Sequence, residues 1–370
     1  MRIGIDAKWY FTGPVSGRTM LQNLLPRLFE FYPEHEWIVF LDKKDKKLDF
    51  PFRQKNIIPR YVWAENNMLS NLFILPRYIR KTGIEVLVFQ TFPSFKQKIK
   101  SIAFIHDVLF KDFPQFFTWK ERLYFFPLAW LTPKADRLIA TTEFVAKELV
   151  RHKYARDRLQ IDIVPLGVSK EFKPAELQDS HFLQEVKKKF GLPSAFVLFA
   201  GRLNIRKNIE ALFKAVALLQ DTGMALVIVG KEDGKSAHLS HFFSDPTIKK
   251  RVLMTGPMTN EELAATYAMA KLFCFPSFAE GFGLPPLEAM ASGVPVVVSN
   301  TTALPEVCGD AAVYIDPAKP ETIAGALNEL SANAAMHMQK RKAGIEQAAK
   351  YDWDNTAHRF MQSILNSVKK

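Results

Sequence analysis

Short, continuous apolar runs recur along the chain and alternate with segments of helical periodicity. In the first half, these runs predict strands at Arg2–Ala7, Glu36–Leu41, Ile84–Phe89, Ile102–Ile105, Arg137–Thr141 and Leu159–Val164. The second half repeats the plan, with strands predicted at Phe196–Ala200, Ala225–Val229, Val252–Thr255, Leu272–Phe275, Val296–Ser299 and Ala312–Ile315. Most runs are continuous rather than alternating, which is typical of parallel strands covered on both faces. Two consecutive βαβ series predict two doubly wound α/β domains.

The joint between the two series is marked by composition. The stretch between Pro165 and Ser194 is rich in charge, Pro and Gly, and Phe172-Lys-Pro174 is the predicted start of the hinge. We therefore expect a first domain over residues 1–175 and a second over residues 176–350. A last helix is predicted over Trp353–Lys370, so residues 351–370 form a terminal element of their own.

Charge divides the chain unevenly. Residues 1–178 carry 29 Lys and Arg against 19 Asp and Glu, a net charge of +10, whereas residues 179–370 carry 21 against 19, a net charge of +2. The first domain is thus basic and the second nearly neutral. The chain has no zinc-ligand spacing, no RNP-like string and no basic–aromatic repeat, so nucleic acid binding is not expected.

The basic half contains two amphipathic segments, Asn66–Lys81 and Leu123–Leu131, with Lys and Arg beside their apolar residues. Two interpretations remain open for them. They form helices that pack on the core with solvated basic faces, the common case for amphipathic helices. Alternatively, they form a peripheral contact with an anionic membrane or a groove for an anionic acceptor.

The cysteine content and the N-terminus bear on location. Cys274 and Cys308 are the only cysteines, and neither their number nor their spacing predicts a disulfide framework, which favours a reducing compartment. Met1–Ala7 is predicted as a strand rather than a signal peptide, and no apolar run reaches the roughly 18 residues of a membrane span. We expect a cytoplasmic protein, at most peripheral at the inner face of the membrane.

The most informative chemistry lies between two glutamates, Glu280 and Glu288. A predicted strand ends before Glu280, and a predicted helix starts at Pro285 and contains Glu288. The turn between them, Gly281–Leu284, presents backbone N–H groups at a helix N-terminus, which suits an anion such as a phosphate. Carboxylates beside an anion site suit hydroxyls, and a sugar nucleotide offers both groups. The competing interpretation is an ordinary strand–loop–helix crossover with solvated glutamates.

Three further loops follow predicted strands, where ligands bind in parallel sheets. The first contains Gly13 and Gly17, which permit close approach of a phosphate or acceptor, with a helix expected after Arg18. The second is His106-Asp107, in which the Asp caps the next turn or orients the imidazole. The third, Gly201–Asn208, collects Arg202, Arg206 and Lys207 before a helix with Asn208 as its N-cap. Cations at a helix N-terminus oppose the helix dipole, which favours a bound anion there.

The string from Ser277 to Gly293 closely resembles the Glu-x7-Glu motif of retaining glycosyltransferases of family 4, which have the GT-B fold. Weaker matches to the same family follow its order along the chain: Ala135–Glu143, Val164–Val168, Thr255–Met258 and Ala303–Glu306. The resemblance implies two facing Rossmann-like domains with an interdomain cleft. The first domain would bind the acceptor and the second the nucleotide sugar, and the terminal helix would cross back to the first domain.

The resemblance also implies roles for individual residues. Arg202 and Lys207 would grip the diphosphate, Glu280 would hold the donor sugar, and His106 would lie close to that sugar; Arg206 is expected to be a solvated neighbour. The implied catalytic set is His106, Arg202, Lys207 and Glu280. The implied donor-binding set is Gly17, Gly281, Phe282, Gly283, Leu284 and Glu288, with Glu288 on the ribose hydroxyls.

The implied activity is transfer of a hexose, with retention, from a UDP- or GDP-linked donor such as GDP-mannose to a hydroxyl of a glycan or lipid-linked acceptor. No cofactor or metal is expected, because the one Asp-x-Asp string, Asp352-Trp353-Asp354, belongs to the cap of the predicted last helix. The setting would be synthesis of a cell-surface polysaccharide or glycolipid. A two-carboxylate glycosidase is disfavoured by the anion site between the glutamates. A nucleotide-sugar epimerase with the same fold and a non-catalytic membrane- or polymer-binding scaffold remain as alternatives.

Overall fold

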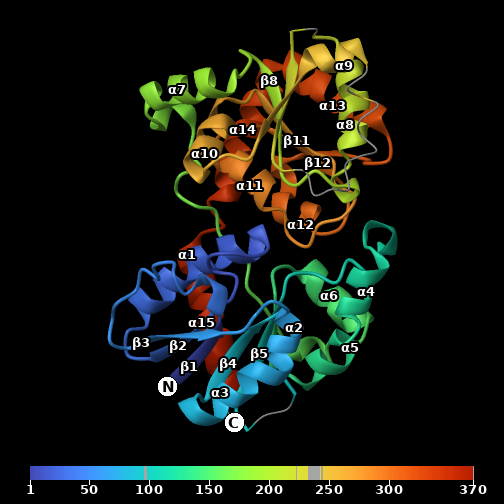
Figure 1. The fold of residues 1–370 in the computed structure, drawn as a ribbon. Helices are drawn as coiled ribbons and strands as arrows, with labels where there is room; N and C mark the ends of the chain where they lie inside the picture. The colour runs from blue at the N-terminus through green and yellow to red at the C-terminus, as the bar shows by residue number, and fades with distance from the viewer. Residues whose placement is uncertain (96–97, 222, 232–241, 243–244, 370) are drawn as a thin grey trace. The chain divides into compact units, whose positions relative to one another are not determined.

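The chain divides into two compact α/β units, shown in Figure 1. The computed structural model describes residues 1–95, 98–221, 223–231, 242 and 245–369. Unit 1 comprises Met1–Gly167 and Asp352–Lys370, and unit 2 comprises Val168–Tyr351. Among the described residues, no helix has both the length and the apolar character needed to cross a bilayer.

Unit 1 is built on seven parallel strands in the order β3-β2-β1-β4-β5-β6-β7. The strands are β1 (Arg2–Asp6), β2 (Glu36–Asp42), β3 (Ile57–Val62), β4 (Val86–Gln90), β5 (Lys100–Ile105), β6 (Arg137–Ala140) and β7 (Ile161–Ile163). The chain moves outward from β1 to β2 and β3, then returns to β4 and moves outward the other way. The strand order therefore reverses between β1 and β4.

One strand of unit 1, β3, was not predicted, while the other six lie within a few residues of their predicted positions. β3 contains Pro59 and Arg60 and is only partly buried. It pairs with β2 alone, at the edge of the sheet. An edge strand tolerates a proline because one side of its backbone needs no partner.

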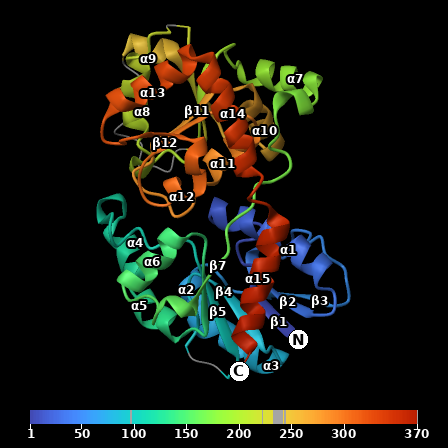
Figure 2. The same cartoon turned by 180° about the vertical axis from the view of Figure 1, so that it is seen from behind.

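Two helices, α1 (Val15–Phe31) and α15 (Trp353–Val368), contact each other, and α15 lies across β4, β5 and β6 (Figure 2). The Phe104 ring of β5 faces α15, with its centroid 6.4 Å from that of Phe360. Its strand neighbours Ala103 and Ile105 point the other way, into an apolar cluster with Leu128 and Leu131. The remaining helices of unit 1 are α2 (Asn67–Leu69), α3 (Leu75–Thr82), α4 (Trp119–Phe125), α5 (Leu128–Leu131) and α6 (Glu143–Arg151).

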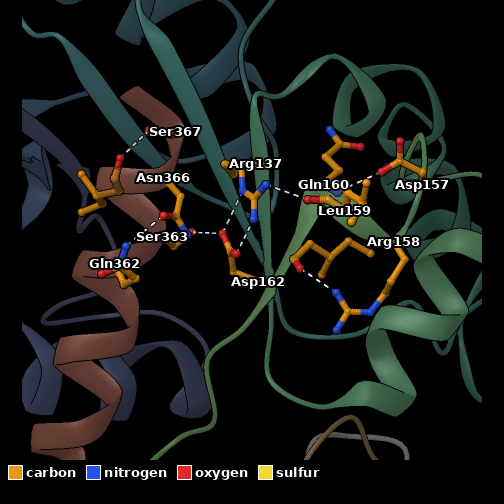
Figure 3. A network of polar contacts seen from close by, with 12 residues as sticks. Arg137, Asp157, Arg158, Leu159, Gln160, Asp162, Gln362, Ser363, Asn366 and Ser367 are labelled. Atoms are coloured by element: carbon orange, nitrogen blue, oxygen red, sulfur yellow. Dashed lines mark hydrogen bonds and ion pairs between the residues drawn. The ribbon is translucent and has the colours of Figure 1, made fainter. Parts of the chain in front are cut away.

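Polar contacts fix α15 to the edge of the sheet, as Figure 3 shows. Ser363 Oγ donates to Asp162 Oδ2 at 2.7 Å, and Arg137 Nε donates to the same oxygen at 2.9 Å. One turn from the start of the helix, Thr356 Oγ1 donates to the Pro165 carbonyl at 2.8 Å. The terminal segment is therefore part of the unit 1 fold. The helix ends at Val368 rather than at residue 370, which lies outside the described residues.

Unit 2 is built on six parallel strands in the order β10-β9-β8-β11-β12-β13, and all six were predicted. They are β8 (Phe196–Ala200), β9 (Ala225–Val229), β10 (Val252–Gly256), β11 (Leu272–Phe275), β12 (Val296–Ser299) and β13 (Val313–Ile315). The strand order here reverses between β8 and β11. The sheet class of both units confirms the doubly wound α/β prediction.

The helices of unit 2 cover both faces of its sheet. Helix α8 packs on α13, while α11 packs on α10 and α14 (Figures 1 and 2). The helices are α7 (Ser180–Phe190), α8 (Ile209–Ala217), α9 (Pro246–Arg251), α10 (Asn260–Met269), α11 (Leu284–Ala291), α12 (Leu304–Cys308), α13 (Pro320–Ala332) and α14 (Ala334–Ala348). Cys274 and Cys308 are both buried and unbonded.

The division between the units lies at Gly167–Val168, ahead of the expected boundary at residue 175. The Val168 N–H donates to the Tyr351 carbonyl at 2.9 Å, within unit 2. The Phe172 ring packs edge-on against Tyr267 with centroids 5.6 Å apart. These contacts bring the expected hinge residues into the second unit.

The contact between Gly167 and the start of α15 predicts a sensitive position. A Cβ at Gly167 would lie 2.3 Å from the Trp353 backbone nitrogen and 2.5 Å from the Asp352 carbonyl carbon. Neither backbone atom moves without displacing α15. We expect Gly167→Ala to lower the free energy of unfolding by about 1–3 kcal/mol, measured by urea denaturation.

Gly325→Ala is the matched control, because no atom lies within 4 Å of the added Cβ on α13. It should leave stability unchanged or raise it by up to about 1 kcal/mol. Equal stability of the two variants would show that the segment at Gly167 does not restrain α15.

Candidate active site

The loops that carry the predicted chemistry of unit 2 follow its two central strands. β8 and β11 are neighbours, and they pair through Val197 and Leu272. The loop after β8 leads to β9 on one side, and the loop after β11 leads to β12 on the other. In open α/β sheets, ligands bind beyond the carboxyl ends of the strands at this point of reversal.

Glu280, in the loop after β11, receives two cations from the loop after β8. Its Oε1 lies 2.8 Å from Lys207 Nζ and 3.0 Å from Arg206 Nη1. The Glu280 residue is 8% exposed and Lys207 is 9% exposed. Burial alone would raise the pKa of Glu280, but the charges of Arg206 and Lys207 outweigh it and lower the pKa to about 2. These three residues form the Glu280 ion cluster, in which the carboxylate is ionised.

Lys207 is buried against the face of the Phe275 ring, with Nζ 4.3 Å from the ring centroid. Burial lowers its pKa to about 8; Glu280 opposes that change, while the nearby charges of Arg206 and Arg202 add to it. Arg202 itself is exposed. The Glu280 carboxylate thus faces two cations, and the charge of a third, Arg202, acts on Lys207, so the loop after β8 carries surplus positive charge. A surplus of this kind attracts an anion.

Arg206 is not the solvated neighbour expected from the sequence. Besides contacting Glu280, its guanidinium donates to the Ala279 carbonyl. Its own carbonyl accepts the Phe278 N–H at 2.9 Å. Arg206 therefore joins the two loops through both its side chain and its backbone. The sequence places Arg206 next to Lys207, but this adjacency alone does not show that both side chains reach Glu280.

Asn208 precedes α8 as expected, but its side chain makes no capping bond. It adopts φ 57°, and its amide donates to the carbonyls of Pro276 at 3.1 Å and Pro317 at 2.6 Å. The side chain that caps the preceding turn is Asn204, which accepts from the Lys207 N–H at 3.2 Å. Asn208 thus holds the loop after β11 rather than the helix.

The turn after Glu280 leads directly into α11. Gly283 occupies the N-cap position with φ 117°, which a side chain rarely allows. The helix begins at Leu284, one residue before the predicted start. Pro285 and Pro286 lack an N–H, so the first helical turn offers fewer donors than an ordinary one. The Phe282 ring packs edge-on against Tyr351, with centroids 5.8 Å apart.

Glu288 lies one turn into α11 and is partly buried. Its Oε2 accepts a hydrogen bond from the Tyr267 hydroxyl at 3.1 Å. Burial raises the pKa of Glu288 to about 7, and the Tyr267 bond only partly offsets it. The two glutamates of the motif are therefore electrically different: Glu280 is ionised, and Glu288 titrates near neutral pH.

In unit 1, Gly17 and His106 both lie next to the side chain of Trp9. Gly17 lies inside the first turn of α1, which begins at Val15, before the expected start. A Cβ at Gly17 would lie 2.5 Å from Trp9 Cε3. The Trp9 and His106 rings have centroids 6.2 Å apart. The glycine therefore allows Trp9 to pack on α1, a role that the sequence analysis did not foresee.

His106 follows β5 and packs on Phe104, with ring centroids 4.8 Å apart. Burial lowers the pKa of His106 to about 4, so its imidazole is neutral. Its Nε2 is buried and has no hydrogen-bond partner among the described residues. Gln90, which pairs with Phe104 across β4 and β5, also lacks partners there for both amide atoms. Asp107 accepts from the Leu109 N–H at 3.2 Å and so caps the next turn.

The point of reversal in unit 1 holds a buried ion pair that the sequence analysis missed. Lys8 Nζ lies 2.7 Å from Asp6 Oδ1 and donates to Asn71 Oδ1 at 2.5 Å. The Asn71 amide donates to Asp6 Oδ2 at 3.0 Å, and the Gln90 N–H donates to the same oxygen at 3.2 Å. The signal in the sequence is an Asp within the predicted strand Arg2–Ala7 and a Lys directly after it.

Within the part of the chain that the structure describes, one group of side chains could hold a metal ion, and it lies in unit 1. Asp112, Glu148 and His152 place their ligand atoms within 4.8 Å of one another. Arg151 also pairs with Asp112 and with Glu148. The guanidinium competes with a cation for the carboxylates, so the group is accounted for as an ion-pair network.

Two family models match most of the chain. The model "Glycosyl transferases group 1" matches residues 183–351, and the model "Glycosyltransferase Family 4" matches residues 31–172. The matched ranges contain the whole Glu280–Glu288 motif, the Glu280 ion cluster and His106.

Among similar curated proteins, the serotype-specific mannosyltransferase WbdA of Escherichia coli is 33% identical over 231 residues, which is 61% of this chain and 28% of WbdA. A D-inositol 3-phosphate glycosyltransferase of Paenarthrobacter aurescens (strain TC1) is 32% identical over 63% of this chain and 58% of that protein. The chain thus matches between about a quarter and three fifths of the length of these relatives.

Solved structures resemble the chain over nearly its full length. Sucrose-phosphate synthase from Thermosynechococcus elongatus has a TM-score of 0.77 at 18% identity, covering 99% of this chain and 98% of that one. Anabaena HepE in complex with UDP and glucose has a TM-score of 0.74 at 16% identity, covering 99% and 100%. This likeness confirms the predicted GT-B fold.

The raised pKa of Glu288 predicts a pH-dependent stability. The folded chain holds this proton up to about pH 7, whereas an unfolded glutamate loses it near its ordinary value of 4.5. Unfolding therefore releases a proton between these values, and stability falls as pH rises through the range, by about 3 kcal/mol for the full shift. The side chain of the Glu288→Gln variant is neutral at every pH, so its free energy of unfolding does not change with this proton. The stability of the variant relative to wild type should therefore rise from pH 4.5 to pH 7. Urea denaturation at several pH values measures the difference.

Glu321→Gln, on the exposed start of α13, is the control and should follow the wild-type pH dependence. If the stability of Glu288→Gln has the same pH dependence as that of wild type, Glu288 is ionised in the folded chain and does not hold a proton up to pH 7.

Proposed function

Because the chain belongs to glycosyltransferase family 4 and has the GT-B fold, we propose that it transfers a hexose from a nucleotide diphosphate sugar to an acceptor hydroxyl, with retention at the anomeric carbon. The observation that carries the proposal is the Glu280 ion cluster. It combines surplus positive charge with an ionised carboxylate at the point of reversal of one sheet. The cations suit a diphosphate and the carboxylate suits sugar hydroxyls.

The proposed step breaks the bond between the anomeric carbon and the β-phosphate oxygen. A new bond forms from the acceptor oxygen to the same face of that carbon, and the acceptor proton passes to the departing phosphate. Negative charge grows on the diphosphate while the sugar ring becomes oxocarbenium-like. Preorganised cations stabilise such a leaving group most in a buried site.

Different residues stabilise the diphosphate leaving group and the sugar ring. Lys207 and Arg202 neutralise the diphosphate, and the backbone of Gly281, Gly283 and Leu284 lies beside it. Glu280 holds donor-sugar hydroxyls and supports positive charge near the ring. Since three cations already supply the compensating charge, we propose that transfer needs no metal ion.

Glu288 and the unit 1 residues complete the proposal. Glu288 accepts from the ribose hydroxyls of the nucleotide, with Tyr267 orienting its carboxylate. His106, neutral and with its Nε2 unpartnered among the described residues, donates to or accepts from a substrate hydroxyl. Gly17 contributes by allowing Trp9 to pack beside His106.

The names of the relatives suggest which substrates to test first. They include mannosyltransferases, one of them an O-antigen chain mannosyltransferase, and inositol-phosphate glycosyltransferases. We propose GDP-mannose as the first donor to test and a cell-surface glycan or lipid-linked glycan as the acceptor. A thermal-shift panel of UDP-, GDP- and ADP-sugars identifies the nucleotide, because a bound ligand raises apparent stability by mass action. Detection of a glycosidic product, rather than interconverted free nucleotide sugar, separates transfer from epimerisation.

Glu280→Gln tests the role of the carboxylate. The amide keeps the shape of the side chain but cannot support positive charge on the sugar, so we expect transfer to fall by at least about a hundredfold. Affinity for the free nucleoside diphosphate should be equal or higher, since the cations lose their internal anion. Transfer is measured as kcat and nucleotide binding by calorimetry.

Glu210→Gln, on the exposed face of α8, is the control and should keep wild-type transfer. Wild-type kcat in Glu280→Gln would remove the carboxylate from the mechanism.

Lys207→Met tests the diphosphate contact. We expect UDP or GDP affinity to fall by about tenfold or more, because hydrogen bonds to charged groups are among the stronger ones. In wild type, affinity should also fall as pH rises above about 8, since deprotonated Lys207 must take up a proton to bind the anion. Lys207→Met should lose this pH dependence, and calorimetry in buffers of different ionisation enthalpy should show proton uptake in wild type only.

Lys214→Met removes an exposed cation of α8, the helix that follows the loop of Lys207, and should change neither affinity nor its pH dependence. Equal affinities of Lys207→Met and wild type would exclude Lys207 from the diphosphate site.

A further inference from the structure

The segment from Trp119 to Leu131 has apolar side chains on two opposite faces. Helix α4 ends at Phe125 and α5 begins at Leu128, and Phe126 and Pro127 between them keep helical backbone angles. One face packs inward: the Phe125 ring stacks on Phe110 with centroids 4.9 Å apart, and Leu128 and Leu131 are buried. This face satisfies the core-packing interpretation of the segment.

The opposite face carries a second apolar row at helical spacing. Trp119, Leu123, Phe126 and Trp130 are exposed to 63%, 62%, 52% and 59%. The Phe126 and Trp130 rings meet edge to face with centroids 4.8 Å apart. We call these four residues the apolar row. Four large apolar side chains, adjacent on one short segment, exceed the scattered exposure that an ordinary surface shows.

Cations border the apolar row. Lys120 and Arg122 lie on α4 between its members, and Lys134 follows α5; all three are exposed. Lys120 Nζ lies 5.7 Å from the centroid of the Trp119 ring. The one acid of α4, Glu121, is engaged in the helix cap, where it accepts from the Thr118 N–H at 2.7 Å. The border of the row is therefore positive.

The surrounding unit has the same sign. Its residues, 1–167 and 352–370, carry 30 Lys and Arg against 19 Asp and Glu, a net charge of +11. α4 and α5 lie on the side of unit 1 opposite β3 (Figures 1 and 2). Leu69 and Phe73 are exposed as well, on a segment that packs on the same apolar cluster through Leu72 and Met68. The apolar face thus belongs to a positively charged body.

We propose that the apolar row docks unit 1 on the surface of an anionic lipid bilayer. Trp and Phe side chains suit the interfacial region of a membrane, where apolar rings enter the headgroup boundary and neighbouring cations meet anionic headgroups. The charge complementarity favours this partner over a second copy of the chain, since two units of like charge repel. The proposal concerns a surface of unit 1 and is independent of the transfer reaction.

Flotation of the full chain with lipid vesicles tests the proposal. The chain should bind vesicles of phosphatidylcholine mixed with phosphatidylglycerol, bind pure phosphatidylcholine vesicles more weakly, and be released by salt. The double variant Trp119→Ser/Trp130→Ser should lower the partition coefficient by about tenfold or more. Lys120→Gln/Arg122→Gln should lower it by about tenfold on mixed vesicles and leave binding to neutral vesicles unchanged.

Matched controls remove the same chemistry elsewhere. Leu159→Ser removes a solitary exposed leucine of unit 1, and Lys188→Gln/Lys342→Gln removes two exposed cations of unit 2; both should bind mixed vesicles as wild type does. All variants should keep the wild-type melting temperature and nucleotide affinity, which separates loss of docking from loss of folding or of donor binding.

Three results would overturn the proposal. One is failure of the wild-type chain to bind mixed vesicles at low salt. The second is equal partitioning of wild type and Trp119→Ser/Trp130→Ser. The third is a wild-type dimer, detected by light scattering, that the same double variant converts to a monomer, which would assign the apolar row to contact between copies.

Discussion

The chemistry of unit 2 depends on contacts between two loops, and the Glu280 carboxylate is at their centre. These loops follow neighbouring strands but lead to opposite sides of the sheet, so the sheet itself does not keep them close beyond the strand ends. The ion pairs of Glu280 with Lys207 and Arg206 supply that connection, together with the bonds that Arg206 and Asn208 make to the backbone of the loop after β11. Breaking a buried pair by removing one partner is costly, since the other charge is then stranded. The contacts that hold the two loops together therefore also set the charge of the site. One carboxylate is shared among several cations, so net positive charge remains.

In unit 1, the strand order reverses between β1 and β4, and the buried charges at this point are balanced. Asp6 and Lys8 form one buried pair, and Asn71 bonds to both partners. The pair itself carries no net charge. The side chains beside it that lack partners among the described residues, His106 Nε2 and the Gln90 amide, are uncharged under ordinary conditions. The two sheets thus present different electrostatics at equivalent positions: the second suits a diphosphate, and the first suits neutral hydroxyl-bearing groups.

Much of this arrangement could be predicted from the sequence, because continuous apolar runs identify buried parallel strands. All six strands of unit 2 and six of the seven in unit 1 were found in this way. β3 was missed because an edge strand with Pro59 has neither a continuous apolar run nor an alternating one. Side-chain partners were harder to predict. In the sequence, Arg206 and Lys207 are simply two adjacent cations. The backbone of the turn determines that both side chains reach Glu280. Asn208 has the residue type of an N-cap, yet a left-handed backbone at that position turns its amide toward two proline carbonyls.

The segment around α4 shows a different limit of sequence analysis. Amphipathic periodicity predicts a helix with one apolar face, and the sequence left open whether that face meets the core or a membrane. The segment has two apolar faces and buries only one, so its packing on the core leaves a second apolar face for another contact. A helix of seven residues gains little from propensity alone, so its start is secured locally by the reciprocal bonds of Thr118 and Glu121. This cap fixes the direction in which Trp119 and Leu123 project without drawing them into the core. Local capping and core packing on one face therefore account for the exposed apolar row on the other, and the row needs no contribution of its own to the stability of the fold.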